Sequence, residues 1–502
     1  MVRSFNIVAA ATFLAGVCQA QATGFKSCDA LVDAGLGESL LLPASEDDTY
    51  TRALGTDYSA TVAEMRPFCI LQPKTVADVS TAVKALAPLS GAGSWNIAVR
   101  GGGHSHWGGN NVHNGVTIDL SLFNRTSVHN STCGKVASIG AGSRWASVLA
   151  ETEKHGLGVT GGRIGTVGVA GLTLGGGTLF LIAERGFACD DVVNYELVLA
   201  DGSVVNANKH DNPRLFKALK GGGSNLGIVT RFDMATFPKK TMYGGIMFID
   251  WKHKDELVDS MIEVISDSEE KPGDSMIVMH TYNAGAAAPM MGTIPMSATG
   301  DEDARPFRGM DQMTAVMDMR TRGTYGELLA VMQDNGGKRN SWYTLCFHND
   351  KRIMNKAEEL FHTLIVDAEK AFPNASWSLN FVFQPLPKVV AKFSGGDALG
   401  LQHSLTHDGI LFAGEATLNT RAEEAYSRLR LAIITHQLEA YAKSVDGNIP
   451  FRYLPYAAPE QDPLSTYGAE NIALMKDVAP EYDPTGFFQT RVSGGFKLDN
   501  VA

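Results

Sequence analysis

The amino-acid sequence predicts an α+β fold, and two stretches of the chain carry that prediction. Residues 66–237 alternate short apolar strands with short helices, and three glycine-rich loops interrupt them. Residues 238–445 instead combine alternating segments such as 244–251 with two long amphipathic helices, at about 353–372 and 421–444. Strands and helices grouped in this way are typical of an antiparallel sheet backed by helices. We therefore expect a glycine-rich region followed by a sheet-and-helix domain.

The elements of the glycine-rich region follow from local signals. Short apolar runs predict strands at 66–72, 96–100, 116–120, 136–139, 193–199, 203–206 and 228–237. Thr75, with Asp78 three residues later, predicts a capped helix, and Ser143 is expected to cap the next one. Asp201-Gly202 is a favoured hairpin turn, and Pro213 suits the first turn of a short helix.

The N-terminus has the pattern of a cleaved secretory signal peptide over residues 1–22. Arg3 provides a positive charge, residues 7–17 are small or apolar, and a cleavage site lies near Ala20 or Ala22. This apolar run is too short to span a bilayer, which needs about 20 residues. We expect a secreted protein without a membrane span, in which Asn124, Asn130 and Asn374 begin glycosylation sequons.

Composition and charge narrow the classes of partner. The chain has 502 residues, 44% of them hydrophobic, which is enough for more than one domain. Its formal net charge of −11 argues against nucleic acid and anionic membranes as partners, because both favour a basic face. A small-molecule substrate is the expected partner.

The cysteine residues that remain after signal cleavage are odd in number. Cys28 and Cys69 bracket the N-terminal segment and are the favoured disulfide, while Cys133 with Cys189 is a second possibility. Cys346 would then remain as a thiol. The chain contains no Cys-x-x-Cys sequence, so the usual thiol-redox and zinc-ribbon patterns are absent.

The central motif is Arg100-Gly-Gly-Gly-His104-Ser105. Consecutive glycines allow a backbone to approach a ligand closely, and their N–H groups can form a concave anion site. A histidine directly after such a cradle suggests a phosphorylated cofactor held from two sides. His104, His106 and His113 also permit a metal-oxygenase alternative, although no carboxylate ligand lies nearby in the sequence.

The common nucleotide-site and hydrolase signatures are absent. No Gly-x-Gly-x-x-Gly follows a predicted strand, and the chain has neither a Walker sequence nor a Gly-x-Ser-x-Gly elbow. A Rossmann dehydrogenase, a P-loop ATPase and an α/β hydrolase therefore lose support.

Several motifs resemble, in the same order, those of the berberine-bridge-enzyme-like flavoproteins, which belong to the vanillyl-alcohol-oxidase and p-cresol-methylhydroxylase (PCMH) superfamily. They are Arg100–Ser105, Thr166–Gly171, Gly186–Asp190 with Leu199–Gly202, Leu219–Val229 and the tail Tyr482–Phe487. The resemblance covers about residues 28–496, and the fungal secreted members of secondary-metabolite pathways are the most similar.

The resemblance implies a two-subdomain PCMH-type FAD-binding domain and an α+β substrate domain. The expected divisions are a signal peptide (1–22), an N-terminal segment of the FAD domain (23–65), the FAD-binding domain (66–237), the substrate domain (238–445) and a C-terminal segment that returns to the FAD domain (446–502). FAD would lie between a subdomain ending near residue 140 and a second one over about 141–237. The implied cofactor-binding residues are Arg100, Gly101, Gly102, Gly103, His104, Ser105, Thr166, Val167, Gly168, Gly171 and Val229.

The resemblance also implies how FAD is attached and reoxidised. The histidine that matches His104 bonds covalently to the flavin in this family. The position of a second, cysteinyl link is Ile164 here, so a single covalent bond is expected. Val167 matches a position that controls oxygen access, and its small side chain favours an oxidase over a dehydrogenase.

Three residues are the expected catalytic group: Tyr453, Tyr456 and Gln384. Gln384 is expected to line the site, and a tyrosine with a lowered pKa would act as the base. His280 and His348 are weaker candidates for a base.

The resulting hypothesis is an FAD-linked oxidase. It would transfer hydride from a small organic substrate, a secondary-metabolite intermediate, to FAD, and O2 would reoxidise the flavin to give hydrogen peroxide. One alternative is an extracellular sugar or alcohol oxidase on the same fold. Another is a metabolite-binding or cyclisation scaffold with a catalytically silent flavin.

Overall fold

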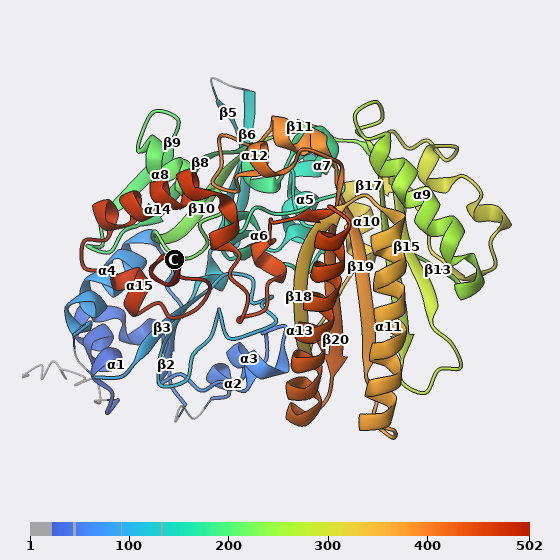
Figure 1. Ribbon diagram of the computed structural model, residues 1–502. Coiled ribbons are helices and arrows are strands. Elements are labelled where there is room, and N and C mark those ends of the chain that lie inside the picture. Colours follow the sequence, from blue (N-terminus) through green and yellow to red (C-terminus); the bar gives the residue numbers. More distant parts are fainter. Residues whose placement is uncertain (1–22, 44–46, 92, 132–133, 502) are drawn as a thin grey trace, which may run out of the picture.

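The computed structural model describes residues 23–43, 47–91, 93–131 and 134–501 (Figure 1). The predicted signal peptide lies outside the described residues. The described chain forms three main sheets, two within residues 40–235 and one within residues 241–449. The predicted α+β class is confirmed.

The first sheet has the order β1-β2-β4-β3, with β2 (Cys69–Leu71), β4 (Gly115–Asp119) and β3 (Asn96–Arg100) parallel and β1 (Leu40–Leu41) antiparallel. Helix α4 (Val76–Leu86) connects β2 to β3. It begins with the predicted capping box between Thr75 and Asp78. The smaller helix α1 (Lys26–Leu31) precedes β1 in sequence, and α2 (Thr49–Leu54) and α3 (Ala60–Ala63) lie between β1 and β2.

The second sheet is antiparallel, in the order β5-β6-β10-β8-β9. Its strands are β5 (Thr126–Ser131), β6 (Gly134–Gly140), β10 (Ile228–Ala235), β8 (Val192–Val198) and β9 (Val204–Asn208). The strand expected at 136–139 pairs with β10, so the two sheets divide between residues 119 and 126 rather than near 140. Asp201 stabilises the β8–β9 turn by accepting the N–H of Ser203 at 2.8 Å.

Short helices connect the strands of this second sheet. They are α5 (Trp145–Lys154), α6 (Val169–Leu174), α7 (Ile182–Arg185) and α8 (Pro213–Leu219). Ser143 was expected to cap α5, but the residue at the N-cap is Arg144, which makes no side-chain capping bond. Pro213 occupies the first turn of α8 as predicted.

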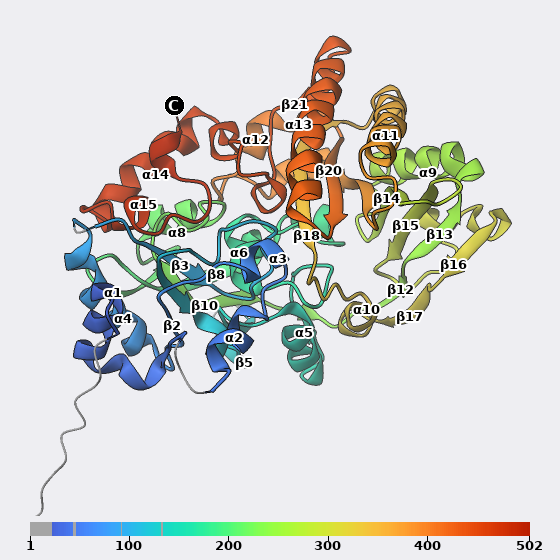
Figure 2. The ribbon, with the colours of Figure 1, turned by 90° about the horizontal axis from the view of Figure 1, so that it is seen from below.

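The third sheet has ten strands and runs β16-β13-β15-β14-β19-β20-β18-β21, with β12 and β17 at one side. Its bounds are β12 (Thr241–Gly244), β13 (Met247–Asp250), β14 (Asp274–Asn283), β15 (Met290–Ser297), β16 (Ala315–Asp318), β17 (Thr321–Thr324), β18 (Arg339–His348), β19 (Ser378–Leu386), β20 (Gly409–Leu418) and β21 (Asn448–Ile449). Helices α9 (Lys254–Ser266), α11 (Lys351–Ala371) and α13 (Arg421–Ser444) cover one face (Figures 1 and 2).

The period of two in these strands separates the two faces of the third sheet. Phe381 and Phe383 of β19 pack in the core beneath the helices. The alternate residues Asn380, Val382 and Gln384 point to the opposite face, where they line a cavity. The helices thus complete one core and leave the other face of the sheet to the site.

The C-terminal segment packs against the first sheet. Helices α14 (Ala469–Tyr482) and α15 (Phe487–Thr490) lie near α8 and the first sheet in both views (Figures 1 and 2). The N–H of Ile97 in β3 donates to the carbonyl of Arg491 at 2.7 Å, and the Arg491 side chain donates to the carbonyls of Ser90 and Trp95.

One disulfide joins Cys28 to Cys69, which confirms the favoured pair. The second possible pair is wrong, because Cys189 is a free thiol that is fully buried in the protein core. Its predicted partner, Cys133, lies outside the described residues. Within the described ranges, no helix has the length and apolar character needed to cross a membrane.

Candidate functional site

A cavity of about 490 Å³ lies between the glycine loops and the open face of the third sheet. Its lining comes from the loops after β3 and before α6, the segment that leads into β10, the strands β14, β15, β18, β19 and β20, and the C-terminal segment, with single residues such as Tyr58 and Asp334. This volume is typical of a small-molecule site.

A buried ion-pair cluster fixes the start of the glycine loop. Arg100 donates to Asp57 at 3.1 Å and to Asp119 at 2.7 Å, and its side chain is 2% exposed. Burial raises the pKa of Asp57 to about 6 despite the neighbouring guanidinium. Burial acts to raise the pKa of Asp119 as well, but the interactions with Arg100 lower it, so the pKa of this carboxyl stays below its ordinary value. Arg100 therefore lies behind the loop and anchors it.

The two glycine loops touch through their backbones. A Cβ atom added to Gly102 would lie 2.3 Å from the Cα of Gly168, and one added to Gly168 would lie 2.6 Å from the Cα of Gly102. Gly103 has a φ of +69°, which favours glycine. Only glycine allows this approach, so the pair forms an open backbone surface of the kind that cradles a pyrophosphate.

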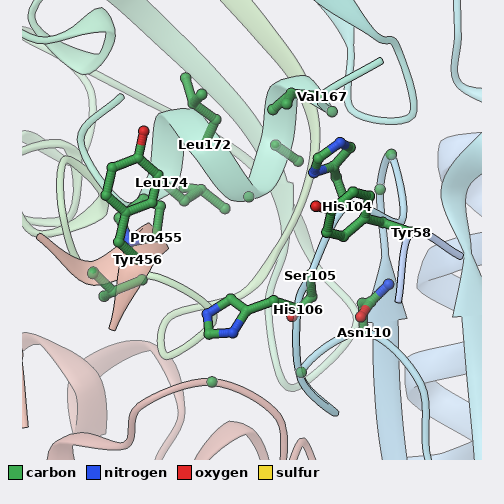
Figure 3. A pocket seen from close by; sticks show the side chains of 18 of the residues that line it. Tyr58, His104, Ser105, His106, Asn110, Val167, Leu172, Leu174, Pro455 and Tyr456 are labelled. Atoms are coloured by element: carbon green, nitrogen blue, oxygen red, sulfur yellow. The ribbon is translucent and has the colours of Figure 1, made fainter. Parts of the chain in front are cut away.

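His104 follows these glycines and lies on the cavity wall, against the ring of Tyr58 (Figure 3). The ring centroids are 4.0 Å apart and the planes differ by 15°. Burial lowers the pKa of His104, which favours the neutral imidazole. Its Nε2 atom is buried without a hydrogen-bond partner. A neutral, stacked imidazole with one unused nitrogen fits the histidyl attachment expected for FAD.

The loop between α10 (Tyr325–Val331) and β18 holds this arrangement from the side of the third sheet. The Tyr58 hydroxyl donates to Asp334 at 2.9 Å, and the Thr166 hydroxyl donates to the carbonyl of Asp334 at 2.7 Å. Gly165 donates its N–H to the carbonyl of Met332 at 3.1 Å. Thr166 thus secures this loop rather than lining the cavity.

The three expected catalytic residues all line the cavity. Arg163 donates to the amide oxygen of Gln384 and, at 2.9 Å, to the hydroxyl of Tyr456. Tyr456 in turn donates to the same amide oxygen at 3.2 Å. The Tyr453 hydroxyl instead accepts the N–H of Thr178 at 2.8 Å. Burial raises the pKa of both tyrosine hydroxyls, contrary to the lowered value expected for a tyrosine base.

Glu415 is a cavity-lining carboxyl that the sequence analysis missed. Burial raises its pKa to about 8; Asp334 adds to the shift and Arg163 opposes it. A signal existed in the sequence, because Glu415 and Thr417 are polar residues at alternate positions of an otherwise apolar strand.

Aromatic side chains complete the wall. The indole of Trp342, on β18, stacks on His106 with centroids 4.9 Å apart and meets Tyr456 edge to face at 5.4 Å. Trp342, Tyr58 and Arg163 belong to no predicted motif, although Arg163 lies just before Thr166–Gly171. Tertiary structure alone brings these side chains together.

The structure does not support the metal alternative. Burial lowers the pKa of His106 to about 3, and His113 accepts the N–H of Arg66 at the exposed surface. No group of three or more potential ligands capable of holding a metal occurs in the part of the chain that the structure describes. The weaker base candidates, His280 and His348, do not line the cavity either; His280 lies in the aromatic core of the third sheet.

Most of the expected cofactor residues come together at this site. Those that line the cavity are Gly101, Gly102, Gly103, His104, Ser105, Val167, Gly168, Gly171 and Val229. Arg100 and Thr166 lie behind this layer, where they support the two loops.

Comparison with known proteins gives a consistent result. Residues 67–208 match the family model described as an FAD binding domain. The FAD-dependent monooxygenase drtC of Aspergillus calidoustus is 33% identical, over 97% of this chain and 92% of its own length. Xylooligosaccharide oxidase from Myceliophthora thermophila has a similar fold, with a TM-score of 0.74, 18% identity and coverage of 94% and 99% of the two chains.

Another fold neighbour is glucooligosaccharide oxidase from Acremonium strictum, which carries a 6-S-cysteinyl, 8α-N1-histidyl FAD. Its TM-score is 0.73 at 20% identity, over 94% of this chain and 99% of that chain. The glycine cradle, the buried histidine and the full-length similarity agree with one another. The chain therefore belongs to the family of FAD-dependent oxidoreductases that includes the drtC monooxygenase, and residues 67–208 match its FAD binding domain.

Proposed function

We propose that this protein is an FAD-linked oxidase that takes hydride from a small organic substrate and returns the electrons to O2 as hydrogen peroxide. The main observation in support is that the glycine cradle with His104 and the polar residues of the third sheet line the same cavity. A cofactor and a substrate bound there would be in direct contact. We propose a secondary-metabolite intermediate as the substrate, because the sequence motifs resemble those of fungal secreted members of secondary-metabolite pathways; the relatives named as FAD-dependent monooxygenases support a reaction that uses O2.

The residues of the cradle fit FAD. The backbone of Gly101–Ser105 would hold the pyrophosphate, with Gly168, Gly171 and Val229 lining the same groove. His104 would hold the flavin covalently, as a histidyl bond does in the Acremonium strictum enzyme. Ile164 offers no sulfur for a second bond, so we propose a single link. When bound, FAD supplies the two-electron acceptor that no side chain of the cavity provides.

Glu415 is the residue best matched to take the substrate proton. A general base works best when its pKa lies near the operating pH. The pKa of Glu415 is about 8, whereas burial holds the pKa of both tyrosines above the ordinary value. Tyr456 remains the alternative base, because Arg163 stabilises its phenolate form.

The first test is a visible spectrum of the purified protein before and after acid precipitation. We expect a yellow protein whose colour stays in the pellet. A screen of substrates by peroxide release would follow. Colour released into the supernatant would contradict the covalent link alone, and a colourless protein after refolding with FAD would contradict the whole proposal.

Two outcomes of that screen would change the assignment. The name of the Aspergillus calidoustus relative favours monooxygenation, in which an atom of isotopically labelled O2 would appear in the organic product. An oxidase leaves all of the label in peroxide. Peroxide formation with simple sugars would instead favour the carbohydrate-oxidase alternative that the fold neighbours suggest. Failure of every substrate to bleach the flavin would favour the scaffold alternative.

We also propose that the protein acts in the secretory pathway or outside the cell. The Cys28–Cys69 disulfide supports this location, because such bonds persist in oxidising compartments. Mass spectrometry of the secreted protein should find an N-terminus just after Ala20 or Ala22.

A further inference from the structure

The cavity contains one guanidinium group, that of Arg163, which precedes α6. No other Arg or Lys is among its described lining residues. In the part of the chain that the structure covers, Arg163 forms no ion pair with a carboxylate. The buried Arg100, by contrast, has two such partners. The positive charge of Arg163 is therefore available to a ligand.

Neighbouring side chains hold this guanidinium in place. Its Nη2 donates to both Gln384 and Tyr456, and its Cζ lies 5.8 Å from the centre of the Phe180 ring. Its Nε and Nη1 atoms donate to no group among the described residues. The head group is thus fixed, with unused donors at the cavity surface.

Gln384 adds a second unused donor beside it. Its side chain is 1% exposed, and its amide oxygen accepts from Arg163 and Tyr456. These two bonds set the orientation of the amide, and its Nε2 group is buried without a hydrogen-bond partner in a residue that lines the cavity. A buried donor of this kind normally has a partner, and a bound ligand would provide one.

We infer that Arg163 and Gln384 form an oxyanion subsite, which holds an acidic oxygen of the substrate while another part of the substrate reacts. The ligand chemistry is a carboxylate or an ionised phenol or enol. This inference rests on the proposed function only in taking the same cavity as the substrate site.

The two carboxyl groups of the cavity do not occupy this subsite. Asp334 accepts from the Tyr58 hydroxyl at 2.9 Å and from the N–H of Gly336 at 3.0 Å. Glu415 forms no ion pair with Arg163, and burial raises its pKa to about 8, so it is largely neutral at pH 7. An incoming anion therefore meets a fixed cation without a competing carboxylate bound to it.

The test measures binding of matched aromatic probes to the flavin-loaded protein. Benzoate is compared with benzamide, and 4-nitrophenolate with 4-nitroanisole, by the change in flavin absorption and in tryptophan fluorescence, since Trp342 lines the cavity. Wild type should bind at least one anion about tenfold more tightly than its neutral counterpart, which corresponds to ~1.4 kcal/mol. Preference for benzoate alone identifies a carboxylate ligand, and preference for 4-nitrophenolate alone identifies a phenolate.

The variants separate charge from folding. Arg163→Gln should abolish the preference, Arg163→Lys should keep most of it, and the surface variant Arg214→Gln should match wild type. Equal affinity for charged and neutral probes, a preference that survives in Arg163→Gln, or no binding of either anion would overturn the subsite. A colourless protein that still prefers the anion by fluorescence would contradict the proposed function but leave the subsite standing.

Discussion

The protonation states of a few individual side chains determine the acid–base chemistry of this cavity. Three of the titratable groups that line it are Tyr453, Tyr456 and Glu415. The charge of Arg163 acts to lower the pKa of each of them. Their environments differ, because the Tyr453 hydroxyl already accepts a backbone N–H, whereas Glu415 has no hydrogen-bond partner among the described residues and has a pKa of about 8. The three groups therefore differ in how readily they can accept a proton from a substrate.

The pH dependence of the reaction should report Glu415. Its raised pKa keeps the group protonated below about pH 8, and a base must be ionised, so kcat/KM should rise with pH and level off above that value. Glu415→Gln should lower kcat by about 10²–10⁴-fold and remove the rise. Steady-state rates across pH check this, with Tyr456→Phe for comparison; an unaltered profile in Glu415→Gln together with a flat one in Tyr456→Phe would transfer the role to Tyr456.

His104 should control how the flavin is retained. His104→Ala removes the only nitrogen expected to bond to the cofactor, so the colour should move from the acid pellet to the supernatant. The flavin midpoint potential should also fall, because a covalent histidyl bond raises it in this family. Spectra and a reductive dye titration measure both effects. Colour that remains in the pellet would show attachment through another residue.

At the scale of helices and loops, steric fit between backbones limits which residues the site can contain. Gly168 and Gly171 lie three residues apart, at the start of and within α6. A Cβ on Gly168 would collide with the backbone of Gly102, whereas a Cβ on Gly171 meets nothing within 4 Å. The same glycine-to-alanine change should therefore have opposite effects at the two positions.

Gly168→Ala should destabilise even the flavin-free protein, since a backbone clash forces the two loops apart. Gly171→Ala should leave its Tm unchanged or slightly higher, because alanine favours a helix by ~1 kcal/mol. Gly171→Ala should weaken FAD binding nevertheless, because its new methyl group would enter the groove proposed for the cofactor. Thermal melts with and without FAD test this pair, and equal melting losses in both variants would refute it.

Sequence patterns predicted the elements whose signals are local. The Thr75–Asp78 capping box, the Asp201-Gly202 hairpin and the 421–444 helix are confirmed. They depend on residues close in the chain. The predicted subdomain boundary near residue 140 is wrong, because residues 134–140 pair with β10. β10 lies nearly a hundred residues later in the chain, so no local pattern indicates this pairing.

The same limit applies to the site. The glycine cradle and His104 are contiguous in sequence, so one motif predicts them together. Gln384 and the two tyrosines are predicted separately, in the light of the resemblance. Tyr58, Asp334 and Trp342 come from three separate segments and carry no motif. Only folding brings them to one wall, so no local pattern could reveal their partnership.

At the scale of the whole molecule, the Cys28–Cys69 disulfide ties the N-terminal segment to the first sheet. It closes a loop with a sequence separation of 41 residues. Cross-links of this kind stabilise proteins by about 2–4 kcal/mol, mainly by restricting the unfolded chain. Its loss should be visible in the stability of the entire FAD domain.

The double variant Cys28→Ser with Cys69→Ser should have a lower Tm than wild type. Addition of a reductant should bring wild type down to the same value and leave the double variant unaffected, which excludes an effect through Cys189 or Cys346. Thermal melts under both conditions provide the measurement. A reductant effect in the double variant would show that another disulfide contributes.

The return of the C-terminal segment to β3 has a consequence for the order of events during synthesis. Arg491 bonds to the backbone around Trp95, and Gly495 and Phe496 line the cavity that the glycine loop begins almost four hundred residues earlier. A ribosome-bound chain has made its cradle long before it has made the wall that closes it. FAD can therefore enter the complete proposed site only after the segment around Gly495 and Phe496 has been made and has folded back onto the glycine loop.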